Sequence, residues 1–135
     1  MKPPSFIYLF LALALKLNGQ CEQSFKTAEA NLGQNFIVDP QHAQAMMSNG
    51  DSLTFQATWL ASNTYRVATS SSEKQPVRFI LFDQNNTPIF DSSEFNYPVK
   101  WDFFVEESMI IRCVVRTVID ISEPYCLTTL TGFKK

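Results

Sequence analysis

The chain has 135 residues, of which 45% are hydrophobic and 13% aromatic, enough for one packed domain and too apolar for a disordered chain. Its formal net charge is −2, from 11 basic and 13 acidic residues. Such a balance argues against a nucleic-acid binder and against electrostatic docking on an anionic membrane, because both need a basic face.

Residues 1–20 have the three parts of a secretory signal peptide: a basic start at Lys2, an apolar run over 5–15 and a small-residue exit at Asn18-Gly19-Gln20. The apolar run is too short to span a bilayer comfortably. We therefore predict cleavage near residue 20 and an exported single domain of residues 21–135, either periplasmic, outer-membrane-associated or secreted. Removing Lys2 and Lys16 from the 11 basic residues leaves 9 against 13 acidic ones, a net charge of −4.

The three cysteines are Cys21, Cys113 and Cys126. In an oxidising compartment we expect one disulfide and one cysteine left over, and the sequence allows three pairings. Cys113 and Cys126 are a candidate pair because they lie in neighbouring predicted strands, although a simple hairpin does not place them opposite each other. Cys21 can reach either of them. Gln20 stands where lipoprotein processing needs a small residue, so the sequence argues against a lipid anchor on Cys21.

The first predicted elements after the signal segment are short. Residues 22–34 have helical spacing, with Phe25, Ala28 and Leu32 on one face and Gly33 as the stop. Residues 36–38 are extended, and Asp39-Pro40 favours a helical turn over 41–47.

From residue 52 onward the hydrophobic pattern alternates with a period of two, which is typical of half-buried strands. The predicted strands are 52–59, 64–70, 76–83, 88–91, 99–106, 109–119 and 125–134, and Gly132 is expected to mark a bulge or bend. The pattern predicts an all-β fold, an antiparallel β-sandwich or jelly-roll-like domain of six or seven strands with a short N-terminal helix over an open end or an edge. The two sheets should pack through Phe55, Trp59, Tyr65, Phe79, Leu81, Trp101, Phe103 and Ile111.

A resemblance rests on the order of several short motifs. The chain runs from residues 36–39 through Tyr65-Arg66-Val67 and 79–83 to Phe90-Asp91, then through Trp101-Asp102-Phe103 to Cys126 and a closing Gly132-Phe133-Lys134. It resembles small uncharacterised exported β-sandwich proteins of Bacteroidetes-type bacteria, and its layout is similar to pre-peptidase C-terminal-like jelly-roll domains. The resemblance implies a secreted bacterial sandwich domain without a known catalytic role.

Candidate catalytic residues are sparse. His42, the single histidine, lies in a polar turn without a nucleophile motif, and a solvated surface histidine is the stronger interpretation. Glu106 and Glu107 are adjacent, so they point apart and make a poor acid/base pair. Asp83, Asp91 and Asp102 fall near strand ends and could form a calcium-binding rim, although such aspartates more often bind turn amides. We expect no metal and no cofactor.

The candidate binding surface comprises Phe104, Tyr97, Asp83 and Asp91. Phe104 falls on the polar face of its predicted strand, where an apolar side chain can mark a binding or assembly surface. We expect recognition through this face or through the loops 70–75 and 92–97. The leading hypothesis is an exported, non-enzymatic module that binds a protein, an envelope component or a glycan. The alternatives are a small secreted hydrolase and a structural or adhesive envelope subunit.

Overall fold

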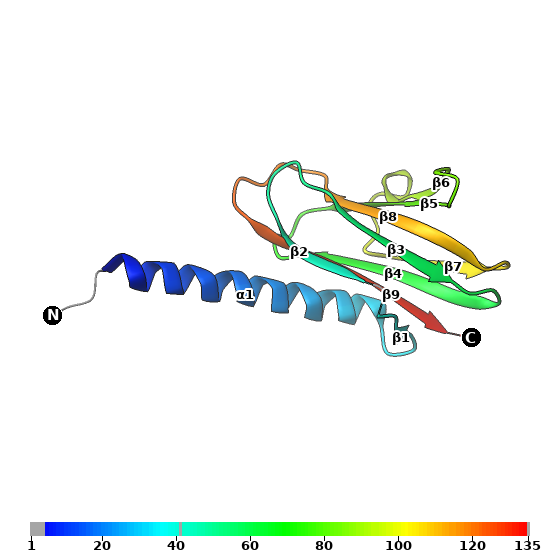
Figure 1. Ribbon diagram of the computed structural model, residues 1–135, viewed down its shortest axis with the longest axis horizontal. Coiled ribbons are helices and arrows are strands. Elements are labelled where there is room, and N and C mark those ends of the chain that lie inside the picture. The colour runs from blue at the N-terminus through cyan, green and yellow to red at the C-terminus, as the bar shows by residue number, and fades with distance from the viewer. Residues whose placement is uncertain (1–4, 41, 135) are drawn as a thin grey trace.

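Two antiparallel sheets face each other, and one long helix lies against the outer face of the first sheet (Figure 1). The computed structural model describes residues 5–40 and 42–134, with side chains from residue 19 onward. The elements are α1 (Ser5–Leu32), β1 (Ile37–Val38), β2 (Ala43–Met47), β3 (Leu53–Trp59), β4 (Asn63–Ser71), β5 (Val77–Phe82), β6 (Pro88–Asp91), the 3-10 turn η1 (Ser92–Phe95), β7 (Lys100–Val105), β8 (Met109–Thr117) and β9 (Tyr125–Lys134).

The strand pairing is nested: β2 pairs with β9, β3 with β8, β4 with β7 and β5 with β6. The first sheet has the order β1-β9-β4-β7, with β2 also paired to β9, and the second has the order β3-β8-β5-β6. The predicted antiparallel sandwich is thereby confirmed.

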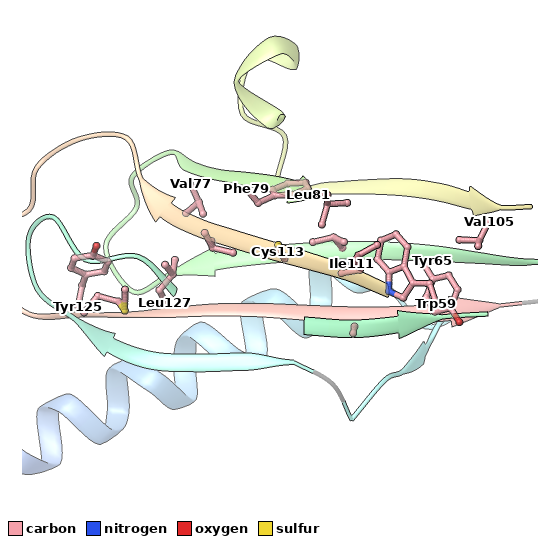
Figure 2. Packing of buried hydrophobic residues seen from close by; sticks show 14 residues of the cluster. Trp59, Tyr65, Val77, Phe79, Leu81, Val105, Ile111, Cys113, Tyr125 and Leu127 are labelled. Atoms are coloured by element: carbon pink, nitrogen blue, oxygen red, sulfur yellow. The ribbon is translucent and has the colours of Figure 1, made fainter. Parts of the chain in front are cut away.

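The predicted alternation places the expected side chains between the sheets. On β8, Ile111, Cys113 and Val115 are buried, whereas Arg112 and Arg116 lie on the outer face. Trp59 stacks on Tyr65 with ring centroids 4.8 Å apart, and Figure 2 shows the two rings side by side within the core. All eight core residues expected from the sequence belong to this cluster or pack against it.

Helix α1 covers a sheet face, and neither the open end nor the edge expected from the sequence. Ala28 and Leu32 pack on Ala68 of β4 and Leu130 of β9. Strand β9 is therefore covered on both faces, which explains why its residues 125–132 are all buried. Gly33 ends the helix as predicted, with a φ of +86°, a conformation that suits glycine.

Three further expectations are corrected by the structure. The helix is one continuous element from Ser5, longer than the predicted 22–34 segment, whereas Met1 and Lys2 lie outside the described residues. Residues 43–47 form strand β2 instead of a helical turn, because pairing with β9 overrides the helical preference of alanine, glutamine and methionine. Gly132 marks no bulge, since its pairing with Arg66 keeps the regular register of β4 and β9.

The disulfide joins Cys21 to Cys126, and the proposed pairing of Cys113 with Cys126 is wrong. The physical reason is topology: β8 and β9 belong to different sheets, so residues 118–124 are a crossover and not a hairpin turn. Cys126 faces helix α1, whereas Cys113 is free and buried in the core between the sheets.

Candidate functional site

Three turns meet at the end of the sandwich where β7 passes into β8. They join β3 to β4, β5 to β6 and β7 to β8. Two of them are tied together, because the amide of Ala61 donates to Ser108 Oγ at 2.9 Å and the amide of Ser62 donates to the carbonyl of Val105 at 2.7 Å. The β3–β4 and β7–β8 turns are thus held together.

Phe104 lies at this end, on the outer face of β7. Its neighbours Phe103 and Val105 point into the core, so the two-residue period of the strand sends Phe104 outward with Lys100 and Asp102. Its exposed fraction is 68%, the largest among the exposed large hydrophobic residues of the described chain. Phe104 is therefore exposed, as expected from its place in the alternation.

Phe104 borders a hollow of about 500 Å³ that is also lined by Asp83, Glu106 and Glu107. We call these four residues the turn-end surface. Two of the four residues expected at a binding surface, Phe104 and Asp83, therefore lie together, although they are 21 positions apart in the sequence. The surface combines one exposed aromatic ring with three carboxylates.

Asp83 has a structural role within this surface. Its Oδ1 accepts hydrogen bonds from the amides of Asn85 and Thr87, both at 2.9 Å, and so holds the β5–β6 turn. This is the turn-stabilising role that aspartate commonly plays after a strand. Asp83 therefore stabilises the turn that lines the same hollow as Phe104.

The other two aspartates of the expected rim lie elsewhere, so the three do not converge. Asp91 forms an ion pair with Arg78, with Nε and Oδ1 3.0 Å apart. Asp102 forms a two-point ion pair with Arg66 on the outer face of the first sheet. Within residues 5–40 and 42–134, no group of three histidine, cysteine, aspartate or glutamate side chains is placed to hold a metal ion.

The ion pairs change the acidity of both aspartates. Hydrogen bonding from Arg78 holds the pKa of Asp91 well below its usual range, and the backbone and hydroxyl of Ser93 add to the effect. Hydrogen bonding from Arg66 likewise lowers the pKa of Asp102. Both carboxylates are therefore charged at neutral pH and engaged in the fold, which does not suit them for general acid chemistry.

Tyr97 lies at the opposite end of the sandwich from Phe104. It follows Asn96 in a tight turn in which both residues have positive φ, +62° and +55°. The turn is closed by the amide of Tyr97, which donates to the carbonyl of Ser92 at 3.0 Å. Tyr97 lines a second hollow together with residues of the loop 72–76, so the two loops expected to take part in recognition do meet.

His42 is exposed, and its ring lies edge-on to Phe25 with centroids 6.2 Å apart. Its Nδ1 lies 3.4 Å from the carbonyl oxygen of Asp39. These contacts place the histidine beside Phe25 of helix α1.

One residue near the turn-end surface was missed by the sequence pattern. Leu60 has an exposed fraction of 56% and lies in the β3–β4 turn, next to Ala61. It immediately follows the inward Trp59 and so falls at an outward position. An apolar side chain at such a position was the available signal. Arg66 lies on the outer face and is the centre of a contact network with the helix, for which the sequence carries no local signal.

No protein-family model matches this chain, and no curated protein sequence matches it either. Among solved structures, it is similar to Aeromonas hydrophila PliG, a periplasmic lysozyme inhibitor of g-type lysozyme. The identity is 13%, the TM-score is 0.51, and the match covers 70% of this chain and 87% of that chain. At this identity the likeness shows that the two proteins share a β-sandwich fold.

Proposed function

We propose that this chain is an exported binding module that acts on a protein partner without catalysing a reaction. The observation that carries the proposal is Phe104, an aromatic side chain with an exposed fraction of 68% held on a regular strand. Aromatic side chains contribute strongly to protein interfaces because they bury a large area with little loss of conformational entropy. A rigid strand presents such a ring better than a loop does.

The charge of the turn-end surface indicates the kind of partner. Asp83, Glu106 and Glu107 contribute three negative charges, and Arg112 nearby is held over the Phe82 ring at 4.4 Å. The surface therefore suits a partner with a basic rim around an apolar contact. The similar structure is an inhibitor of g-type lysozyme, and we propose a lysozyme as the first candidate partner.

Export is part of the proposal. Residues 5–18 extend beyond the sandwich in Figure 1, whereas the described helix contacts begin near Cys21. Cleavage near residue 20 would remove the projecting segment and leave Cys21 bonded to Cys126. Disulfides persist in oxidising compartments outside the cytoplasm, and the bond occupies the Sγ atom that a lipid would need. No helix in the described part of the chain has the length and hydropathy needed to cross a bilayer.

The test is a binding and inhibition experiment with the oxidised, natively exported protein. Binding to a purified g-type lysozyme is measured by biolayer interferometry, and lysis of a peptidoglycan suspension is followed with increasing amounts of the protein. We expect saturable binding and inhibition, and a loss of affinity of about thirtyfold for Phe104→Ser, as expected for an aromatic hot spot. Ile119→Ser is the matched control, because Ile119 is 51% exposed in the crossover between β8 and β9.

The lysozyme partner and the turn-end surface are tested separately. Absence of binding to the lysozyme rejects that partner and leaves the turn-end surface to be tested with crosslinking in the native exported fraction. There, a crosslinked partner must be lost with Phe104→Ser and kept with Ile119→Ser. Equal crosslinking by both variants would reject the turn-end surface itself.

A further inference from the structure

Strand β7 is the last strand of the first sheet, and β4 is its one neighbour in the sheet order of the described strands. Its register with β4 is regular from Lys100 to Val105. A regular strand at the edge of a sheet presents a row of free backbone donors and acceptors, to which another strand can pair. We call the side of residues 100–104 that faces away from β4 the β7 edge.

The hydrogen bonds to β4 determine which backbone groups of β7 lie on the free side. The amide of Thr69 donates to the carbonyl of Val99 at 2.9 Å, and Lys100 lies directly opposite Ala68. Opposed residues of an antiparallel pair alternate between hydrogen-bonded and non-hydrogen-bonded pairs, and Lys100 with Ala68 is a pair of the second kind. The amide and carbonyl groups that point to the free side therefore belong to residues 100, 102 and 104.

Two charged side chains of opposite sign lie along the β7 edge. Lys100 and Asp102 are both exposed on the outer face, two positions apart. The side chain of Asp102 is 43% exposed in spite of its ion pair with Arg66, so it remains open to a further cation. A lysine on an edge strand commonly keeps copies apart, because two like charges meet when the edges pair. Here Asp102 follows on the same face, so an antiparallel second copy can place a carboxylate opposite each Lys100.

The charges favour one register for two copies of β7 related by a two-fold axis. An axis at Lys100 places the two Lys100 side chains opposite each other, and an axis at Asp102 places two carboxylates opposite each other. An axis at Phe103 places Asp102 opposite Phe104. An axis at Trp101 places each Lys100 opposite Asp102 of the other copy, and opposite charges on facing residues stabilise a strand pair. This register also joins the free backbone groups of the two edges, because residues 100 and 102 both point outward.

The same register brings apolar side chains together on the inner side of the strand. Val99 is 51% exposed, and Trp101 packs on the exposed ring of Phe95 with centroids 4.5 Å apart. With the axis at Trp101, Val99 of one copy lies opposite Phe103 of the other, and the two Trp101 residues face each other. Charge on the outer side and apolar area on the inner side thus favour the same arrangement. We propose that two copies of this chain associate by antiparallel pairing of their β7 edges, with Trp101 at the two-fold axis.

This self-association is separate from the proposed function. The paired stretch ends at Phe104, opposite Pro98 of the other copy, so the two turn-end surfaces lie at opposite ends of the dimer. Pairing of one short strand buries little area, and we expect a weak monomer–dimer equilibrium. A lysozyme is not needed for it, so the failure of either proposal leaves the other to its own test.

The test is sedimentation equilibrium of the oxidised, natively exported protein over micromolar to millimolar concentrations. We expect a monomer–dimer equilibrium that Lys100→Glu weakens by about tenfold or more, because a carboxylate at this position faces Asp102 of the other copy. Lys26→Glu is the matched control. It makes the same charge change on helix α1, where the side chain of Lys26 is 66% exposed, and it should dimerise as the wild type does.

A mixing experiment tests the register itself. Asp102→Lys places two lysines opposite each other and should also weaken the dimer. An equimolar mixture of Lys100→Glu and Asp102→Lys should recover association, because both facing pairs of the mixed dimer then carry opposite charges. If Asp102→Lys does not fold, the comparison of Lys100→Glu with Lys26→Glu still decides whether the β7 edge is the contact.

Three results would overturn the proposal. The first is a wild-type protein that stays monomeric over the whole concentration range. The second is equal association of Lys100→Glu and Lys26→Glu, which would place the contact elsewhere on the molecule. The third is a mixture of the two folded charge variants that associates no better than each variant alone.

Discussion

Arg66 and Asp102 form a two-point ion pair across β4 and β7, with Nε–Oδ1 and Nη2–Oδ2 separations of 2.6 and 3.0 Å. The same guanidinium donates from Nη1 to the carbonyl of Leu32 at 3.0 Å, at the C-terminus of helix α1. It also lies over the ring of Phe36, 4.1 Å from the centroid. One side chain thus joins the edge of the first sheet to the end of the helix that covers it.

Replacement of Arg66 should cost more than replacement of its carboxylate partner. Asp102→Asn removes a half-exposed ion pair, so we expect a loss of about 0.5–1 kcal/mol in the free energy of unfolding. Arg66→Lys also removes the two-point geometry and the flat group over Phe36, and we expect about 1–2 kcal/mol. Urea unfolding of both variants measures the difference, and equal losses would show that the helix contact contributes nothing.

Asp91 should make the domain sensitive to acid. Its pKa is lowered in the folded state by hydrogen bonding from Arg78, relative to about 3.9 in the unfolded chain. The stabilisation is therefore fully present above the unfolded pKa and is lost as pH falls toward the folded pKa. Asp91→Asn should be less stable than wild type at pH 7, and the gap should narrow between pH 5 and 2.

Urea unfolding at a series of pH values checks this prediction. Asp83→Asn is the comparison, because Asp83 accepts backbone amides and has no arginine ion pair in the described structure. A gap between wild type and Asp91→Asn that stays constant down to pH 2 would contradict the assignment of acid sensitivity to this carboxylate.

Most strands from residue 52 onward were predictable because one face lies in the core and the other in solvent, whereas β9 is covered on both faces. In β3, for example, Ala57 and Trp59 are buried whereas Thr54, Gln56 and Thr58 are exposed, which is a direct record of the pleat. The sequence of β2 has no clear alternation of apolar and polar side chains. Its residues favour a helix, and only pairing with β9 makes them a strand. Tertiary pairing, and not the local sequence, therefore determines that these residues form a strand.

The candidate site was also predictable only in part. Phe104 could be found from the sequence because it breaks a local alternation. Its proximity to Asp83 could not be found in this way, because it depends on which turns lie at the same end of the sandwich. The cysteine pairing stayed open for a similar reason, since Cys113 and Cys126 are close in sequence but the sheet assignment separates them.

Gly132 is required for close packing of the helix on β9. A Cβ atom at this position would lie 2.9 Å from Leu32 Cδ1 and 3.0 Å from Phe36 Cβ. Gly132→Ala should therefore cost about 1–3 kcal/mol in unfolding free energy through overpacking. The double variant Gly132→Ala/Leu32→Ala should lose less than the sum of the two single variants, because the new methyl group enters space that Leu32 leaves. Additive losses in urea unfolding would contradict this contact.

The disulfide between Cys21 and Cys126 should be a major contributor to stability, because it closes a loop with a sequence separation of 105 residues. Loss of such a bond typically costs about 2–4 kcal/mol. The double variant Cys21→Ala/Cys126→Ala should show that loss in urea unfolding and should not respond to added reductant.

Cys113 gives the matched control for the disulfide. Burial raises the pKa of the Cys113 thiol, so it should react with a thiol reagent only on unfolding. Cys113→Ala should keep the full response to reductant, since the Cys21–Cys126 bond remains. If reductant instead had no effect on Cys113→Ala, the disulfide would have to involve Cys113, and the assignment of the bond to Cys21 and Cys126 would be wrong.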